Sequence, residues 1–297
     1  MRSASLLLVV AILAMVSCGK DRIPLKPANR TGPDFVFWST RTNGLADLFA
    51  MNSDGTGLHQ LTSDTLEDRE PRWSPDGTKI VYVHRYDPNS DSADVTVMSA
   101  DGTNRIRLTR DYADANPTWS PDGHKIAYLH DPAYVTNQLW VMNADGTSPQ
   151  LLIDSDSLNG VNQITWTSQN TFLGADWFGL VKFNADGTGR TRVLSLTNVL
   201  YAYPRPSPDG TKIVFAWAGP LPASGSDIYT ISADGTNLRQ LTTSGGATLP
   251  VWSPDGTRIG YIGDDFGMWT MNVDGTNKVR VPVSSPSPGG DYLGDWR

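Results

Sequence analysis

Cysteine is almost absent from this chain of 297 residues, which contains Cys18 alone. One thiol cannot form a disulfide within a molecule, so no such cross-link can hold the fold together. Long apolar runs are also missing: the run at residues 6–16 is far shorter than the roughly 20 residues of a membrane-spanning helix. Positive charge is not in excess either, because 24 Lys and Arg face 31 Asp and Glu, a formal net charge of −7. This balance argues against nucleic acids and anionic membrane surfaces as partners.

The N-terminal segment has the composition of a processing signal. A basic residue precedes the apolar run, and Cys18 and Gly19 follow it. This order resembles the bacterial lipoprotein signal, in which a small residue precedes a cysteine that becomes lipidated; an ordinary cleaved signal is the alternative. We therefore expect residues 1–17 to be a signal peptide, Cys18 to carry lipid and residues 18–33 to be a flexible tether. Such a protein would be held in the periplasm by its lipid, with the outer membrane favoured because Gly19 supplies no aspartate retention signal.

Six copies of one turn-and-strand pattern fill the remainder of the sequence. The first turn reads W-S-P-D-G at 73–77, 119–123 and 252–256, P-S-P-D-G at 206–210 and W-T-S-Q-N at 166–170. The second turn contains Asp-Gly-Thr in every unit, and its aspartates are Asp54, Asp101, Asp145, Asp186, Asp234 and Asp274. Their spacings of 47, 44, 41, 48 and 40 residues are typical of a β-propeller, in which each unit holds several short strands.

This arrangement predicts an all-β, six-bladed β-propeller over residues 34–297, with four antiparallel strands in each blade. The Asp-Gly pairs suit tight hairpin turns, so their aspartates are interpreted as turn residues rather than as metal ligands or catalytic acids. The first unit lacks its own innermost strand, whereas Trp296 lies 44 residues after Trp252, where the next innermost strand is due. We therefore expect the C-terminal strand to complete the first blade, which removes an exposed sheet edge.

The repeated element P-x-W-S-P-D-G-x-K-I, followed by [NS]-x-D-G-T-x-x-x-x-L-T, resembles the TolB-type propeller repeat over nearly all of residues 34–297. The same repeat occurs in propeller domains of some prolyl peptidases and in some polysaccharide lyases. The resemblance extends to the propeller half of TolB. It implies a six-bladed disc in the periplasm that binds an envelope protein, or a peptidoglycan-associated partner, over its central channel. We expect a monomer that contacts the membrane only through its lipid, with no cofactor and no nucleic-acid partner.

The lengths of the connections predict where a partner binds. The turns between the first and second strands, and between the third and fourth, are short and repetitive, whereas the other two connections are long and variable. Recognition is therefore expected on the face of the long loops. Candidates at the channel mouth are Glu70, Arg72, Asn116, Tyr203, Arg205 and Asp295, and candidates in the loops are Tyr86, Tyr134, Trp177 and Trp217. Arg, Tyr and Trp are enriched at binding hot spots, although ordinary solvated loop residues are the alternative.

Two histidines raise an enzymatic alternative. His84 and His130 hold the same place in adjacent units, directly after the second strand, and could share a metal as in the lyases with this repeat. The other units offer no further ligand there, and the chain has no G-x-S-x-G nucleophile motif, so no catalytic residue is predicted. Residues 87–94 have the spacing D-x-N-x-D-x-x-D, which resembles the start of a calcium loop, but a solvated acidic loop is preferred.

The hypothesis for the whole protein is a lipid-anchored binding module. A metal-dependent carbohydrate-active enzyme and a purely structural envelope component are the alternatives.

Overall fold

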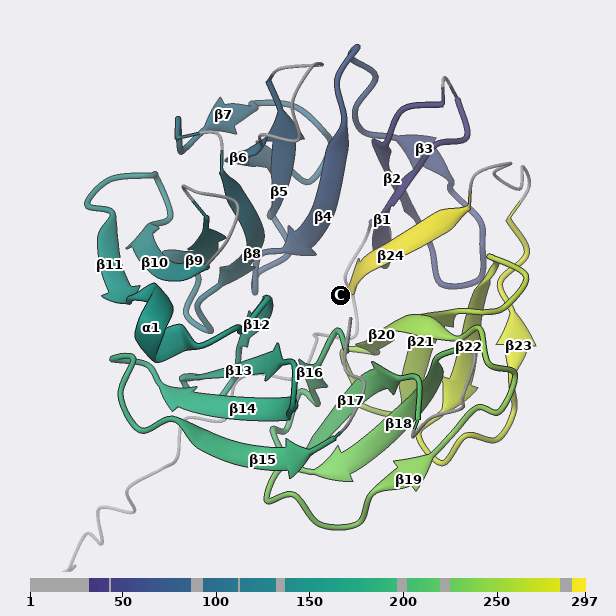
Figure 1. The fold of residues 1–297 in the computed structure, drawn as a ribbon. Helices are drawn as coiled ribbons and strands as arrows, with labels where there is room; N and C mark the ends of the chain where they lie inside the picture. Colours follow the sequence, from purple (N-terminus) through teal and green to yellow (C-terminus); the bar gives the residue numbers. More distant parts are fainter. Residues whose placement is uncertain are drawn as a thin grey trace, which may run out of the picture.

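The computed structural model describes residues 32–42, 44–86, 93–111, 113–131, 137–196, 202–219, 225–283 and 290–297. Within them the chain forms six four-stranded antiparallel sheets that stand around a central axis (Figure 1). The predicted all-β, six-bladed β-propeller with four strands in each blade is confirmed. The expected signal peptide, Cys18 and Tyr134 lie outside the described residues, as does most of the acidic stretch 87–94.

The strands follow one another from blade to blade, and only blade 1 draws on both ends of the chain. Blade 1 holds β24 (Asp291–Trp296), β1 (Phe35–Ser39), β2 (Asp47–Met51) and β3 (His59–Gln60). Blade 2 holds β4 (Asp68–Trp73), β5 (Lys79–Arg85), β6 (Ala93–Ser99) and β7 (Ile106–Arg107). Blade 3 holds β8 (Asp114–Trp119), β9 (Lys125–His130), β10 (Gln138–Asn143) and β11 (Gln150–Ile153).

The second half of the ring repeats this order. Blade 4 holds β12 (Gln163–Trp166), β13 (Thr171–Asp176), β14 (Gly179–Asn184) and β15 (Thr191–Ser195). Blade 5 holds β16 (Arg205–Pro206), β17 (Lys212–Trp217), β18 (Asp227–Ser232) and β19 (Arg239–Gln240). Blade 6 holds β20 (Thr248–Trp252), β21 (Arg258–Ile262), β22 (Met268–Asn272) and β23 (Val279–Arg280). In each blade the first strand in this order lies nearest the central axis (Figure 1).

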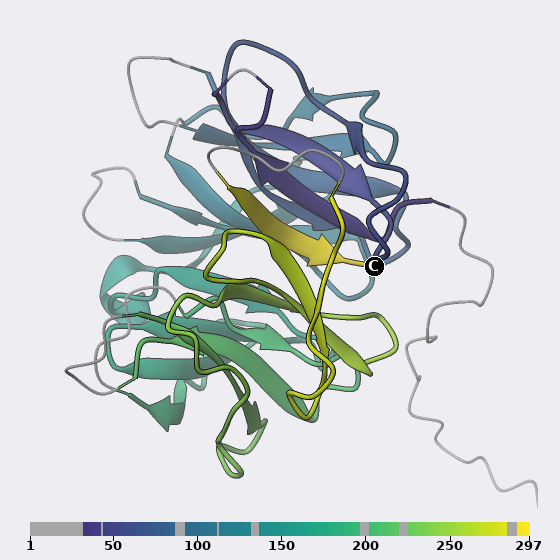
Figure 2. The same cartoon turned by 90° about the vertical axis from the view of Figure 1, so that its right-hand side faces the viewer.

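The C-terminal strand closes the ring, as the sequence predicts. β24 pairs antiparallel with β1, with Phe35 opposite Trp296, so the two ends of the propeller share one sheet (Figures 1 and 2). Trp38 of β1 stacks on Tyr292 of β24, with ring centroids 3.7 Å apart. Because β24 supplies the innermost strand of blade 1, this sheet has the same four strands as the others and packs against β4 and β20 on its two sides.

The hydrophobic core lies between neighbouring blades. The third strand of every blade contributes one large side chain, three residues before the aspartate of the second turn, and all six are buried: Met51, Met98, Met142, Phe183, Ile231 and Met271. Burial of a side chain of this size stabilises a fold by about 1.5–3 kcal/mol. Methionine fits the irregular space between twisted sheets because its side chain is long and flexible. The methionines of these strands therefore belong to the core.

Local hydrogen bonds build the Asp-Gly turns. In blade 2 the Gly77 amide donates to the Ser74 carbonyl at 2.8 Å, and Ser74 Oγ donates to Asp76 Oδ1 at 2.6 Å. Asp76 Oδ1 also accepts from the Thr78 amide at 3.0 Å. Gly77 has a φ of 68°, which is strained for a residue with a Cβ. Blade 4 has lost Pro-Asp-Gly yet keeps a turn, with Asn170 at a φ of 54°, because asparagine tolerates this conformation.

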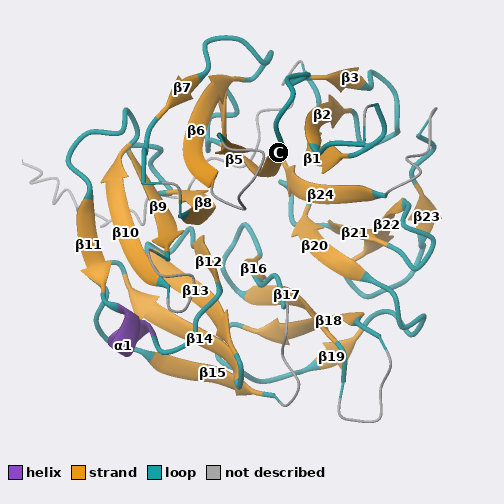
Figure 3. Cartoon of the chain, turned by 45° about the horizontal axis from the view of Figure 1, so that its top comes forward, coloured by secondary structure: helices purple, strands orange, loops and turns teal. Residues whose placement is uncertain are grey.

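One short helix, α1 (Ser155–Leu158), lies between blades 3 and 4 and was not predicted (Figure 3). Asp154 caps it by accepting a hydrogen bond from the Ser157 amide at 2.8 Å. Leu158 is buried in the core between the two blades. In the part of the chain that the structure describes, no helix is long and apolar enough to cross a membrane.

Candidate binding site

The innermost strands enclose a cavity of about 320 Å³ at the centre of the ring. Each blade contributes the residue directly before its tryptophan position, and all six of these residues line the cavity: Arg72, Thr118, Thr165, Arg205, Val251 and Asp295. Indole and proline rings form a collar around them, which comprises Trp73, Trp119, Trp166, Trp252, Trp296, Pro75, Pro121, Pro206, Pro208 and Pro254. The cavity therefore combines charged groups with a large apolar surface. The candidate residues predicted from the sequence do not include this collar.

The cavity lies beside the short turns rather than beside the long loops. Pro75 and Pro208 belong to the turns between first and second strands, and both line the cavity. The long loops leave the opposite ends of these strands, and therefore the opposite face of the ring. The expectation that Arg72, Arg205 and Asp295 share a face with the variable loops is thus wrong. The short, repetitive turns, which were not predicted to take part in binding, frame this part of the channel.

Two arginines from opposite blades reach the same carbonyl group in the cavity. Arg72 Nη1 and Arg205 Nη2 each donate a hydrogen bond to the Gly294 carbonyl oxygen at 3.2 Å. Arg205 Nη1 also donates to Thr165 Oγ1 at 3.2 Å. The Nε atoms of both arginines are buried and have no hydrogen-bond partner among the described residues. Because a guanidinium carries five N–H donors, this pair retains capacity to hold a carboxylate or a peptide carbonyl.

One carboxyl group accompanies the two guanidinium groups. Asp295 Oδ2 accepts a hydrogen bond from the Trp73 amide at 3.0 Å. Burial raises the pKa of Asp295 to about 6, and the charge of Arg72 opposes that shift. Burial also lowers the pKa of Arg72, which Asp295 opposes, but a guanidinium stays protonated at neutral pH. The cavity lining therefore carries two positive charges and one carboxylate that loses its charge below about pH 6.

Residues three positions before the tryptophans connect blades and do not line the cavity. The Asn116 amide donates to Glu70 Oε2 at 2.6 Å, and the Tyr203 amide donates to Gln163 Oε1 at 2.6 Å. Glu70, Asn116 and Tyr203 all have positive φ, of 56°, 53° and 46°. This left-handed conformation interrupts the alternation of the strand. The structure thus places these three candidates in contacts between blades.

The loop candidates lie at the other face of the ring, where second strands end and third strands begin. Trp177, in the turn between β13 and β14, exposes 54% of its surface. Tyr86 is held more firmly, because the Arg107 guanidinium lies 3.8 Å from its ring centroid. Trp217 packs against Tyr229, with ring centroids 5.3 Å apart. Of these three aromatic residues, Trp177 presents the largest share of its surface to solvent.

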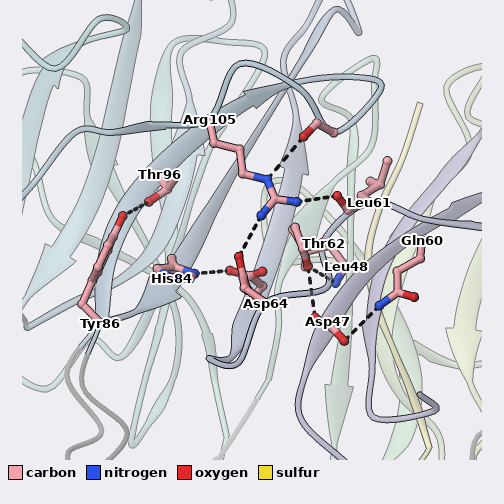
Figure 4. Close-up of polar contacts among 12 residues, drawn as sticks. Asp47, Leu48, Gln60, Leu61, Thr62, Asp64, His84, Tyr86, Thr96 and Arg105 are labelled. Carbon is pink, nitrogen blue, oxygen red and sulfur yellow. Dashed lines mark hydrogen bonds and ion pairs between the residues drawn. The ribbon is translucent and has the colours of Figure 1, made fainter. Parts of the chain in front are cut away.

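His84 and His130 each bind a different aspartate. His84 Nδ1 lies 2.6 Å from Asp68 Oδ1, and His130 Nδ1 lies 2.8 Å from Asp114 Oδ1. Both aspartate side chains are fully buried. The hydrogen bond that His130 makes to the Asp114 carboxylate raises the pKa of His130. Asp64, which was not predicted as a site residue, also lies near His84 (Figure 4). The feature of the sequence that could have revealed it is an aspartate two residues after the Leu-Thr pair of its unit.

Comparisons with known proteins agree with this architecture. No protein-family model and no curated protein sequence matches the chain. The structure of TolB from Acinetobacter baumannii aligns with a TM-score of 0.73 at 17% identity, over 89% of this chain and 67% of that one. A putative TolB from Agrobacterium tumefaciens aligns with a TM-score of 0.64 at 18% identity, over 89% and 98% of the two chains. A nidogen/laminin complex aligns with a TM-score of 0.69 at 12% identity, over 88% and 98%. The chain therefore has the TolB-type six-bladed β-propeller fold.

Proposed function

We propose that this protein is a lipid-anchored periplasmic propeller that recognises a protein of the cell envelope through its central cavity. The observation that carries this proposal is the convergence of Arg72 and Arg205 on one carbonyl oxygen inside a collar of indole and proline rings. Arginine and tryptophan dominate the binding energy of many protein interfaces. The likeness to TolB supports the periplasmic setting, and the likeness to a nidogen/laminin complex supports protein recognition.

The cavity favours a short acidic segment of the partner. A volume of about 320 Å³ admits a few side chains rather than a folded domain. A carboxylate that enters it would meet the guanidinium groups of Arg72 and Arg205, which can bind it with paired N–H donors. The surrounding tryptophan and proline rings would bury apolar atoms of the same segment. When one member of a partially buried, doubly hydrogen-bonded charge pair of this kind is truncated, binding weakens by about 2–5 kcal/mol.

Affinity capture from the envelope of the source organism tests this proposal. The tagged full chain serves as one bait, and a second bait carries Arg72→Gln and Arg205→Gln, which keep hydrogen-bonding groups but remove both charges. A third bait carries Arg239→Gln, an exposed arginine on the outer strand β19, as the matched control. We expect one partner that the wild type and the Arg239 variant retain and that the double variant loses. The Kd of the purified partner should rise by more than about tenfold in the double variant.

Three results would contradict the proposal. Identical proteins on all three baits would show that the cavity arginines play no part in recognition. A partner lost instead on substitution of Trp177, with Arg72 and Arg205 dispensable, would place recognition on the long-loop face. Failure of all three baits to capture a partner would favour a purely structural envelope component. The enzymatic alternative, with one metal shared by His84 and His130, is not favoured by the separate aspartate partner of each histidine.

A further inference from the structure

A buried carboxylate between blades 1 and 2 has only part of its hydrogen-bonding capacity filled. Asp68 begins β4, and its side chain is completely buried. Its Oδ1 atom lies 2.6 Å from His84 Nδ1, whereas its Oδ2 atom has no hydrogen-bond partner among the described residues. An unpaired carboxylate oxygen is costly in the interior of a protein, unless a proton or a cation binds it.

A second carboxylate supplies another unpaired oxygen at the same place. Asp64 lies in the connection between β3 and β4, and its Oδ2 atom is 2.8 Å from Arg105 Nη1. Its Oδ1 atom is buried and unpaired among the described residues. One ligand atom from each of Asp64, Asp68 and His84 lies within 4.8 Å of the other two. Figure 4 shows Asp64 beside His84. Ligands bound to one metal at about 2.0–2.2 Å are at most about 4.4 Å apart, so little movement would bring them together.

Blade 3 repeats two of these three groups and provides an internal comparison. His130 pairs with Asp114, and Asp114 Oδ2 is likewise buried without a partner among the described residues. Asp111 follows the Leu-Thr pair of its unit by two residues, as Asp64 does in the preceding unit, but it precedes the buried aspartate by three residues rather than four. Of the described residues, only the set in blade 2 brings three such groups within 4.8 Å.

We propose that Asp64, Asp68 and His84 bind one divalent transition-metal cation, of the Zn²⁺ or Mn²⁺ class. An imidazole with two carboxylates suits these ions, whereas Ca²⁺ and Mg²⁺ prefer oxygen ligands alone. The cation would offset the negative charge of both carboxylates. It would also fasten the connection between blades 1 and 2 to the end of β5, where His84 is located. The competing arrangement is a proton shared between the two carboxyl groups.

Calorimetric titration of the purified, tag-free protein with ZnCl₂ tests this site. The wild type should bind one Zn²⁺ per chain. Asp64→Asn should weaken binding by more than about tenfold, the minimum loss that follows removal of even an outer-shell partner of a metal site. The side chain of Asp64 is 38% exposed, so this variant should fold normally. His130→Gln, in the incomplete set of blade 3, is the matched control and should bind Zn²⁺ as the wild type does.

Thermal unfolding gives an independent measure, because a cation that binds only the folded chain raises its melting temperature. Zn²⁺ should raise Tm in the wild type and in His130→Gln but not in Asp64→Asn, and Ca²⁺ at the same concentration should have no such effect. Absence of Zn²⁺ binding would leave the shared proton as the correct arrangement and overturn the proposal. Equal binding by Asp64→Asn, or an equal loss in His130→Gln, would overturn it as well.

Discussion

The ionisation of Asp295 gives the central cavity a pH-dependent contribution to stability. Its pKa is raised by burial from 3.8 to about 6. Between about pH 4 and pH 6 the folded chain therefore holds a proton that the unfolded chain has released. The free energy of unfolding falls as the pH rises through this range, and the contribution of the protonated carboxyl group is lost once the pH exceeds about 6. Asp295→Asn cannot ionise. It should exceed the wild type in stability at pH 7 by up to about 3 kcal/mol, and the difference should fall below about 1 kcal/mol at pH 4.

Urea unfolding of the wild type and of Asp295→Asn at pH 4, 5, 6 and 7 measures this difference. Comparison of the two proteins cancels the contributions of other buried acids, such as Asp68 and Asp114, whose pKa values burial also raises. Asp54→Asn is the control, because hydrogen bonds from Thr56 lower the pKa of this exposed turn residue. That variant should gain no stability at pH 7. A stability difference for Asp295→Asn that is the same at every pH would contradict the assignment.

At the level of the secondary-structure elements, β24 determines whether the ring closes. Leu293 of β24 is 2% exposed and packs with Phe35, Phe37 and Val251 at the junction of blades 1 and 6. Leu293→Ala should lower the free energy of unfolding by about 2–5 kcal/mol, because it leaves a cavity in this junction. Leu238→Ala, at a position that is 44% exposed, should change it by less than about 0.5 kcal/mol. Chemical denaturation of both variants measures these free energies of unfolding. Similar losses in the two variants would contradict the prediction that packing of the closing strand stabilises the ring.

The elements also explain which features could be predicted from the sequence. The repeated turns specify strand order, blade number and closure, because each turn marks the end of a known strand. The site could not be placed in the same way. Simple alternation along a strand puts Glu70 and Arg72 on one side, but β4 shifts register between Arg69 and Arg72, and Glu70 has a positive φ. Arg72 therefore lines the cavity while Glu70 bonds to the next blade, and no periodicity in the sequence reveals that shift.

At the scale of the whole molecule, the net charge distinguishes two kinds of membrane attachment, electrostatic adsorption and a covalent lipid. The formal net charge of −7 repels anionic lipid headgroups, so electrostatic adsorption contributes little. A lipid on Cys18 would bind through buried methylene groups instead, at about 0.8 kcal/mol for each, and multiple acyl chains give stable anchoring. Attachment should therefore survive high salt and depend on a single side chain.

Membrane fractionation of cells that produce the full chain tests this anchoring. The wild type should remain in the membrane fraction in 1 M NaCl and incorporate labelled palmitate, whereas Cys18→Ser should appear in the soluble periplasmic fraction without label. Ser17→Ala keeps a small residue before the cysteine and should behave as the wild type does. Release of the wild type by salt would indicate electrostatic attachment. A Cys18→Ser variant that stays in the membrane would show that the apolar run, and not a lipid, holds the protein there.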